Sequence, residues 1–325
     1  MTSVQPFRFA VQATQATSAK EWRDVARSVQ DLGYSTLFLA DHYLGPGPAQ
    51  RKAGWPPQYL APVPAMASAA AYTETLRIGC RVFCVDYHVP AVLAKEAATL
   101  DLLSDGRLEF GIGAGWSASE YEAMGVPFAA PGQRVDKLRE VVELVKAHWR
   151  GEPLELRGQY ATATDFAGLP LPVQRPHPPV MIGGSRKRVL SFAAREADIV
   201  SIANVPFAAR NDAGRTPVEE AEHRYAVVRE AAGNRIGALE TESSPFFTRD
   251  TDDPAAAAEK VARRLGVDPA GLLDHPNVLI GSVDEIVDRL HERRERFGAN
   301  YISVQQSETE SFAPVVARLT GRRDK

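Results

Sequence analysis

The sequence predicts an α/β protein built as a single (β/α)8 TIM barrel with insertion segments, one domain over residues 1–325. Short strand-like runs alternate with helical patterns about eight times, which is typical of a parallel barrel. The chain has 44% hydrophobic and 24% charged residues, an ordinary globular composition for one large core. No stretch is poor enough in apolar residues to act as a linker between domains.

Charge and composition exclude several classes of partner. The net charge is −3, so no basic field points to nucleic acid. No apolar run approaches the roughly 20 residues of a membrane span, and the N-terminus lacks the pattern of a signal peptide. Cys80 and Cys84 would lie about 13 Å apart along a strand, too far for a disulfide. We therefore expect a reduced, cytoplasmic protein that acts on a small molecule.

The helices have start and stop signals beside apolar patterns. Ser18 and Glu21 form a capping box before a helix that Gly33 ends, and Ser282 and Glu285 form a second capping box. The expected strands cover residues 7–11, 35–40, 76–85, 107–113, 179–183, 198–203, 238–246 and 301–305, and the expected helices cover 18–33, 64–72, 90–104, 134–149, 185–196, 217–232, 255–265 and 282–298, before a short tail helix.

The stretch from Pro90 to Trp116 organises the chain as a helix, a turn and a glycine-rich strand. Pro90 suits the first helical position, and Val92, Leu93, Leu100 and Leu103 are expected to form one apolar stripe. Gly111, Gly113 and Gly115 alternate, so one face of the strand end carries no side chains. Such glycines often mark the close approach of a ligand or another backbone, and α/β folds bind ligands at the carboxyl ends of strands. Gly113 and Gly115 are therefore candidate ligand-binding residues.

Several long segments follow strand ends and are expected to shape a pocket: 44–64, 117–131, 152–178 and 204–216. The first of them, with Trp55 and Tyr59, is expected to cover a substrate. We find no cluster of His, Cys, Asp and Glu with metal-ligand spacing, and no carboxylate pair that fits glycoside chemistry.

The segment LAKEAATLDLLSDGRLEFGIGAGW, which begins at Leu93, resembles the most recognisable part of the luciferase-like monooxygenase superfamily. It is most similar to the branch that uses the deazaflavin coenzyme F420. The resemblance implies a luciferase-like barrel, a homodimer, and hydride transfer between F420 and a small organic substrate. It also implies that Gly113 and Gly115 lie in the cofactor region.

Asp41-His42 ends the second expected strand. The residues alone fit two interpretations: a structural histidine hydrogen-bonded by Asp41, or a histidine that transfers protons near neutral pH. The resemblance implies that this pair contacts the deazaflavin, with His42 catalytic. In an extended chain Asp41 points away from His42, so we expect Asp41 to fix the strand end by bonding to a neighbouring strand.

Cys84-Val85 lies near the end of the third expected strand, and Cys84 alone reads as a small buried hydrophobe. The resemblance implies that both residues contact the cofactor, with a non-proline cis peptide between them behind the central ring. His88 departs from the family pattern, which leaves its role open.

Gly183-Gly184-Ser185 joins a strand to a helix, and backbone N–H groups at such a helix start bind phosphate. The alternative is an ordinary tight turn. The resemblance places the cofactor phosphate at this segment and suggests that the basic run 186–188 meets the polyglutamate tail of F420. The loose dinucleotide pattern over 113–118 is accidental, because it does not open a helix in a βαβ unit.

Four functions follow from these observations. The first is an F420-dependent oxidoreductase without a metal. The second is an FMN-dependent luciferase-like monooxygenase, which activates oxygen as a reduced deazaflavin does not. The third is a cofactor-binding or carrier protein without turnover of its own. The fourth, a metal-free barrel hydrolase, is weakened by the missing carboxylate pair.

Overall fold

The computed structural model describes residues 5–151 and 153–321. Contacts within the chain group these residues into two units, each described by itself. Residues 12–30 and 36–183 form what we call the N-terminal unit. Residues 5–11, 31–35 and 184–321 form the C-terminal unit.

The main sheet of the N-terminal unit consists of parallel strands. β3 (Arg77–Cys80) pairs with β2 (Thr36–Leu39) and with β5 (Leu108–Gly113), and β5 pairs with β8 (Val180–Gly184). The two-residue β4 (Phe83–Cys84) pairs with the carboxyl end of β5. All residues of β2 and β5 are buried, as expected for parallel strands that are covered on both faces.

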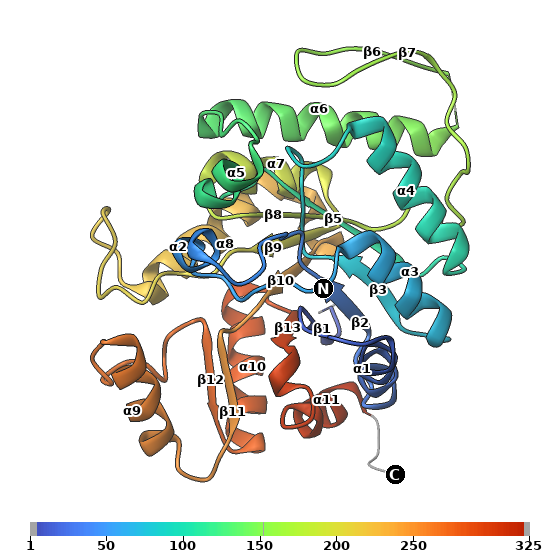
Figure 1. Ribbon diagram of the computed structural model, residues 1–325. Helices are drawn as coiled ribbons and strands as arrows, with labels where there is room; N and C mark the ends of the chain where they lie inside the picture. The colour runs from blue at the N-terminus through green and yellow to red at the C-terminus, as the bar shows by residue number, and fades with distance from the viewer. Residues whose placement is uncertain (1–4, 152, 322–325) are drawn as a thin grey trace. The chain divides into compact units, whose positions relative to one another are not determined.

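Helices connect these strands in the predicted order (Figure 1). The unit contains α1 (Ala19–Asp31), α3 (Pro62–Tyr72), α4 (Pro90–Leu103) and α6 (Pro131–Arg150). Pro90 occupies the first turn of α4, as predicted. The predicted stripe on α4 is wrong in part. Leu93 and Leu100 are buried, whereas Val92 is 51% exposed and Leu103 is 68% exposed.

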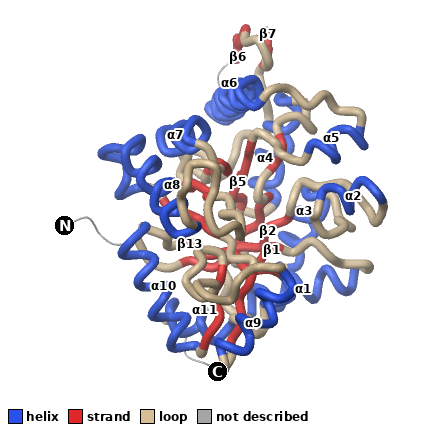
Figure 2. Tube along the Cα trace, turned by 90° about the vertical axis from the view of Figure 1, so that its left-hand side faces the viewer, coloured by secondary structure: helices blue, strands red, loops and turns tan. Residues whose placement is uncertain are grey.

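Three features of this unit lie in segments that the sequence predicted as irregular. They are α2 (Pro48–Ala53), α5 (Ala118–Met124) and an antiparallel hairpin of β6 (Leu154–Arg157) and β7 (Thr162–Phe166). Figures 1 and 2 both show this hairpin reaching out beyond α6.

The C-terminal unit repeats the parallel pattern. β10 (Glu240–Ser243) pairs with β9 (Ile199–Ile202) and with β13 (Tyr301–Gln305). β1 (Arg8–Gln12) leads from this unit into the N-terminal unit. The helices are α7 (Lys187–Glu196), α8 (Pro217–Ala232), α10 (Val283–Phe297) and α11 (Ala313–Thr320), with short 3-10 turns at Gly233–Ala238 and Gln306–Glu308.

A small insertion follows β10. It consists of β11 (Phe247–Asp250), α9 (Pro254–Leu265) and β12 (Val278–Gly281), and its two strands are parallel. Ala257, Ala262 and Ile280 belong to its own apolar core, against which Phe207 packs. The sequence predicted α9 but neither strand.

Two further expectations concern the chain as a whole. Both cysteines are buried and free, as their spacing predicted. Across residues 5–151 and 153–321, the helices are all too short or too polar to cross a membrane.

Candidate active site

Asp41 and His42 follow β2, and their side chains bond to different partners. The Asp41 carboxylate is buried and accepts hydrogen bonds from the Cys84 N–H at 2.8 Å, from His88 Nε2 at 2.9 Å and from the Tyr43 hydroxyl at 2.8 Å. Asp41 therefore fastens the end of β2 to β4, as its orientation predicted. It also gives His88 a structural partner. Contact of Asp41 with a cofactor stays a prediction.

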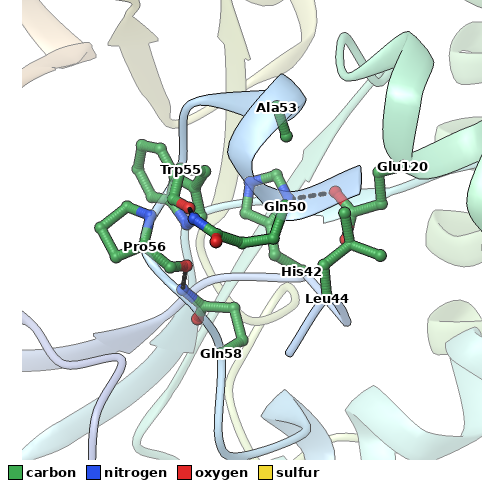
Figure 3. Close-up of a pocket in the computed structure, with 8 residues that line it drawn as sticks. All are labelled: His42, Leu44, Gln50, Ala53, Trp55, Pro56, Gln58 and Glu120. Carbon is green, nitrogen blue, oxygen red and sulfur yellow. Dashed lines mark hydrogen bonds and ion pairs between the residues drawn. The ribbon is translucent and has the colours of Figure 1, made fainter. Parts of the chain in front are cut away.

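His42 pairs with a carboxylate that the sequence did not identify. Its Nδ1 atom lies 2.6 Å from Oε2 of Glu120 (Figure 3). The other oxygen of Glu120 accepts the Tyr43 N–H at 2.6 Å. The interpretation in which Asp41 hydrogen-bonds His42 is wrong. A carboxylate oxygen only accepts, so Nδ1 donates in this bond, and in the neutral imidazole Nε2 is then the acceptor.

Two indole rings contact His42 and each other. The Trp55 and Trp116 ring centroids lie 5.1 Å and 5.6 Å from that of the imidazole. Trp55 contacts His42, and its Nε1 atom is buried without a hydrogen-bond partner. That the segment 44–64 covers a substrate stays a prediction. The cavity left beside His42 is about 10 Å³, room for one water molecule. It is lined by His42, Leu44, Gln50, Ala53, Trp55, Pro56, Gln58 and Glu120.

A non-proline cis peptide lies near this site, but not where the resemblance implied. It joins Arg81 to Val82, between β3 and β4, so the predicted position at Cys84–Val85 is wrong. The predicted third strand is interrupted at this bond, and β4 resumes at Phe83.

The strand glycines face the chain itself. A Cβ atom added to Gly111 would lie 2.1 Å from the Cys80 carbonyl oxygen, and one added to Gly113 would lie 2.8 Å from Val82. Gly115 has φ +72°, and a side chain there would collide with the Tyr121 hydroxyl. The close approach that these glycines predicted is therefore made by neighbouring protein atoms. Whether Gly113 and Gly115 also contact a cofactor stays a prediction.

Cys84 belongs to a polar chain at the carboxyl end of β4. Its Sγ atom lies 2.9 Å from the Tyr121 hydroxyl, which donates to Asp86 at 2.8 Å. Burial raises the pKa of the Cys84 thiol to about 11, so the thiol stays protonated near neutral pH and is not a nucleophile. Val85 is buried, and its N–H donates to the Gly113 carbonyl at 3.1 Å.

The turn from Gly183 to Ser185 connects β8 to α7. A Cβ atom added to Gly184 would lie 2.3 Å from a Val189 methyl group, so glycine is needed there for packing. The N-cap residue of α7, Arg186, makes no side-chain capping bond. The N-cap residue thus supplies no side-chain acceptor to this helix start, and backbone N–H groups at helix starts bind anions. The phosphate contact of Gly183, Gly184 and Ser185 stays a prediction.

Glu120 and Trp116 are the functional candidates that sequence reasoning missed. Glu120 lies on α5, a helix of seven residues within a segment that was expected to be irregular. The parallel topology could have indicated this pairing. β2 and β5 both pair with β3, and residues that follow neighbouring parallel strands meet at the same edge of the sheet. Among the residues that the structure describes, no group of three or more His, Cys, Asp or Glu side chains is arranged to hold a metal ion.

The comparisons with known proteins identify the family. A family model described as luciferase-like monooxygenase matches residues 1–301. The chain belongs to the luciferase-like monooxygenase family. An uncharacterized protein of Mycobacterium tuberculosis is 33% identical to this luciferase-like protein over 186 residues, or 53% of the chain. The match spans 64% of the length of that relative.

Relatives of the luciferase-like protein differ in their named cofactor. An F420-dependent glucose-6-phosphate dehydrogenase of Amycolatopsis mediterranei is 29% identical, over 54% of this chain and 50% of that protein. An FMNH2-dependent dimethylsulfone monooxygenase of Pseudomonas putida is 31% identical, over 34% of this chain and 30% of that protein.

Solved structures confirm the predicted fold class. A long-chain alkane monooxygenase superposes with a TM-score of 0.76 at 16% identity, covering 98% of this chain and 92% of that one. The coenzyme F420 dependent tetrahydromethanopterin reductase of Methanopyrus kandleri gives 0.72 at 18% identity, covering 96% and 97%. The protein therefore has an α/β fold with a closed, eight-stranded parallel barrel of the luciferase-like type.

Proposed function

We propose that this luciferase-like protein is an F420-dependent oxidoreductase that moves a hydride between F420 and a small substrate carrying a hydroxyl or carbonyl group. The hydrogen-bonded pair of His42 and Glu120 carries this proposal. Oxidising an alcohol requires a base for the hydroxyl proton while the hydride leaves carbon, and the reverse reaction requires an acid.

His42 can fill both roles at Nε2. Glu120 holds the proton of Nδ1, so Nε2 accepts the hydroxyl proton and the carboxylate stabilises the imidazolium that forms. Glu120 is itself held by the Tyr43 N–H, which fixes the orientation of the pair. In Figure 3 the second ring nitrogen of His42 lies on the side of Trp55, away from Glu120.

The surroundings of His42 offer two groups that can bond a hydroxyl. Nε2 of the imidazole would accept its proton, and the Nε1–H of Trp55, whose ring centroid lies 5.1 Å from that of His42, is a donor without a partner in this arrangement. Trp116 adds an apolar wall. These rings would exclude water from the reacting atoms.

The residues present fit a flavin-like cofactor. Two buried polar atoms lack partners: Gln12 Nε2, on the last residue of β1, and Ser117 Oγ, after β5. Such atoms suit the carbonyl and amide edges of a ring system. The start of α7 suits a phosphate group. When bound, F420 would supply a carbon centre that accepts or gives a hydride.

The second candidate is an FMN-dependent monooxygenase. The Pseudomonas putida relative supports it, because its name specifies FMNH2 and its identity of 31% is close to that of the F420-dependent relative. His42 would then have no substrate hydroxyl to deprotonate. A test for proton transfer therefore separates the two candidates.

The test is an assay in which oxidised F420 is mixed with each of a panel of small primary and secondary alcohols. The loss of deazaflavin absorbance measures its reduction. We expect at least one alcohol to reduce F420, and we expect His42→Ala to slow that reaction by about 10²–10⁴-fold with little change in F420 affinity. A protein that leaves F420 oxidised with every alcohol, yet consumes oxygen with reduced FMN and a substrate, would be the monooxygenase instead.

A further inference from the structure

His42 is covered too closely for a substrate to reach it. Its side chain is 15% exposed, and the cavity beside it, about 10 Å³, holds no more than a water molecule. Small-molecule sites have cavities of several hundred Å³. The part of the cover that blocks His42 Nε2 is Trp55, which belongs to the segment 44–60 (Figure 3).

The segment 44–60 is held by packing of α2 on α5, by the contact of Trp55 with Trp116 and by one long backbone bond, from the Tyr59 N–H to the Thr14 carbonyl at 3.5 Å. Its only helix, α2, buries no residue. The hydrogen bonds of Gln50 and Gln58 to the Trp55 and Pro56 carbonyls stay within the segment. An ion pair joins Lys52 to Glu122 at 3.2 Å, but both side chains are mostly exposed, and such a pair stabilises little.

Glycines at the N-terminal end and in the middle of the segment suit it to movement. Gly45 and Gly47 have almost no atoms near the position of a Cβ, and Gly54 has φ +67° beside Trp55. Elements with few buried contacts open at low free energy, and active-site lids are drawn from such elements. In the closed arrangement Trp55 Nε1 is buried without a partner, so opening would give this donor a water molecule or a ligand.

We propose that residues 44–60 form a lid, and that Trp55 must leave the ring of His42 before a substrate can reach Nε2. The identity of the molecule that the lid admits, an alcohol or a carbonyl compound, rests on the proposed function. Trp116 lies outside the segment, and its ring centroid is 5.6 Å from that of His42 and 6.3 Å from that of Trp55.

Chemical labelling tests the lid without cofactor or substrate. Diethyl pyrocarbonate acylates neutral imidazole, and mass spectrometry measures the modification of each histidine. His88 is an internal reference, because its side chain is 13% exposed, close to the value for His42, but its ring is not covered by Trp55. We expect Trp55→Ala to raise the labelling of His42 by about tenfold, which corresponds to the free energy of one aromatic contact. The labelling of His88 should not change.

Trp116→Ala is the matched control, since it removes the second indole from the same imidazole. We expect it to raise His42 labelling much less than Trp55→Ala does. Equal effects of the two variants, or no effect of Trp55→Ala, would overturn the lid.

Hydrogen exchange of the unaltered protein gives a second measurement that no folding defect of a variant can obscure. The backbone amides of Arg51, Gly54 and Gln58 are hydrogen-bonded in the closed lid. We expect them to exchange much faster than the buried amides of α3, which follows directly in the chain. Protection equal to that of α3 would contradict the lid. Neither measurement uses F420, so the lid and the proposed function fail separately.

Discussion

The Nδ1 atom of His42 lies 2.6 Å from Oε2 of Glu120, across 78 residues of sequence. This bond joins the loop after β2 to the helix after β5, and the same carboxylate holds the Tyr43 N–H. A histidine fixed in one tautomer at the end of a strand is an arrangement suited to proton transfer. Its neighbour Asp41 has a structural role, which the following predictions separate from that of His42.

Glu120→Gln should reduce turnover with little effect on cofactor affinity. A glutamine amide cannot accept from both His42 and Tyr43 with one oxygen in the present geometry, so the tautomer of His42 is no longer fixed. We expect turnover to fall by up to about 10³-fold, within the range for acid–base assistance. Steady-state rates and F420 dissociation constants measured together check this. An unchanged rate would show that Glu120 does not act through His42.

Asp41→Asn should lower stability instead. The Asp41 carboxylate accepts from Cys84, His88 and Tyr43, and an amide must turn its NH2 group toward at least one of these donors. We expect a loss of about 1–3 kcal/mol in the free energy of unfolding. Tyr43→Phe is the control, because it removes one donor and should cost about 0.5–1.5 kcal/mol. Urea unfolding of both variants measures these losses. Equal stability of Asp41→Asn and the natural protein would show that Asp41 does not hold the end of β2.

His148 should make the protein less stable in mild acid. It is buried on α6 against Gly168 and Phe166, and burial lowers its pKa below the ordinary 6.5. As the pH falls below about 6.5, the unfolded chain binds a proton at His148 that the folded chain does not, so the free energy of unfolding falls with pH. His148→Gln should lose less stability between about pH 7 and about pH 5. Equal losses in the two proteins would contradict this assignment.

The homodimer that the family resemblance implied stays a prediction. The exposed side of α4 is a candidate surface for the contact between two copies. Val92 and Leu103 on α4 and Val89 at its N-cap are exposed, while the other side of the helix is buried. Exposed apolar patches often mark protein–protein contacts. Lys95 and Glu96 are adjacent on this helix, so two copies could pair their opposite charges across a two-fold axis.

Light scattering tests the dimer. We propose that the natural protein has twice the mass of one chain and that Val92→Arg yields the monomer. Phe246→Arg, at an exposed apolar residue of the C-terminal unit, should leave the mass unchanged. A monomeric natural protein would end this proposal.

The alternation of strands and helices could be predicted because long elements carry their own periodic signals. Capping boxes located α1 and α10, and Pro90 located α4. The short elements α2 and α5 have too few residues to show a period, so the helix that carries Glu120 was missed. The stripe on α4 failed for a different reason: a pattern shows which residues are apolar, but not which of two apolar faces is covered.

The candidate site was predictable only in part. His42 follows a strand, and position alone made it a candidate. Its partner Glu120 depends on a contact between distant residues, which no local pattern encodes. The cis peptide was placed three residues too late, because the local sequence contains no signal for it and the position came from resemblance alone. The glycines of β5 predicted a close approach, but the structure was needed to identify Val82 and Tyr121 as the groups that approach.

The most direct test of the proposed function is a fluorescence titration of the purified protein with F420 and, separately, with FMN. The proposal predicts saturable binding of F420 at a lower concentration than FMN requires, and loss of F420 affinity when the start of α7 is altered by Ser185→Asp, which places a negative charge beside the expected phosphate. Tight binding of FMN with no detectable binding of F420 would contradict it and assign the protein to the oxygen-activating members of its family.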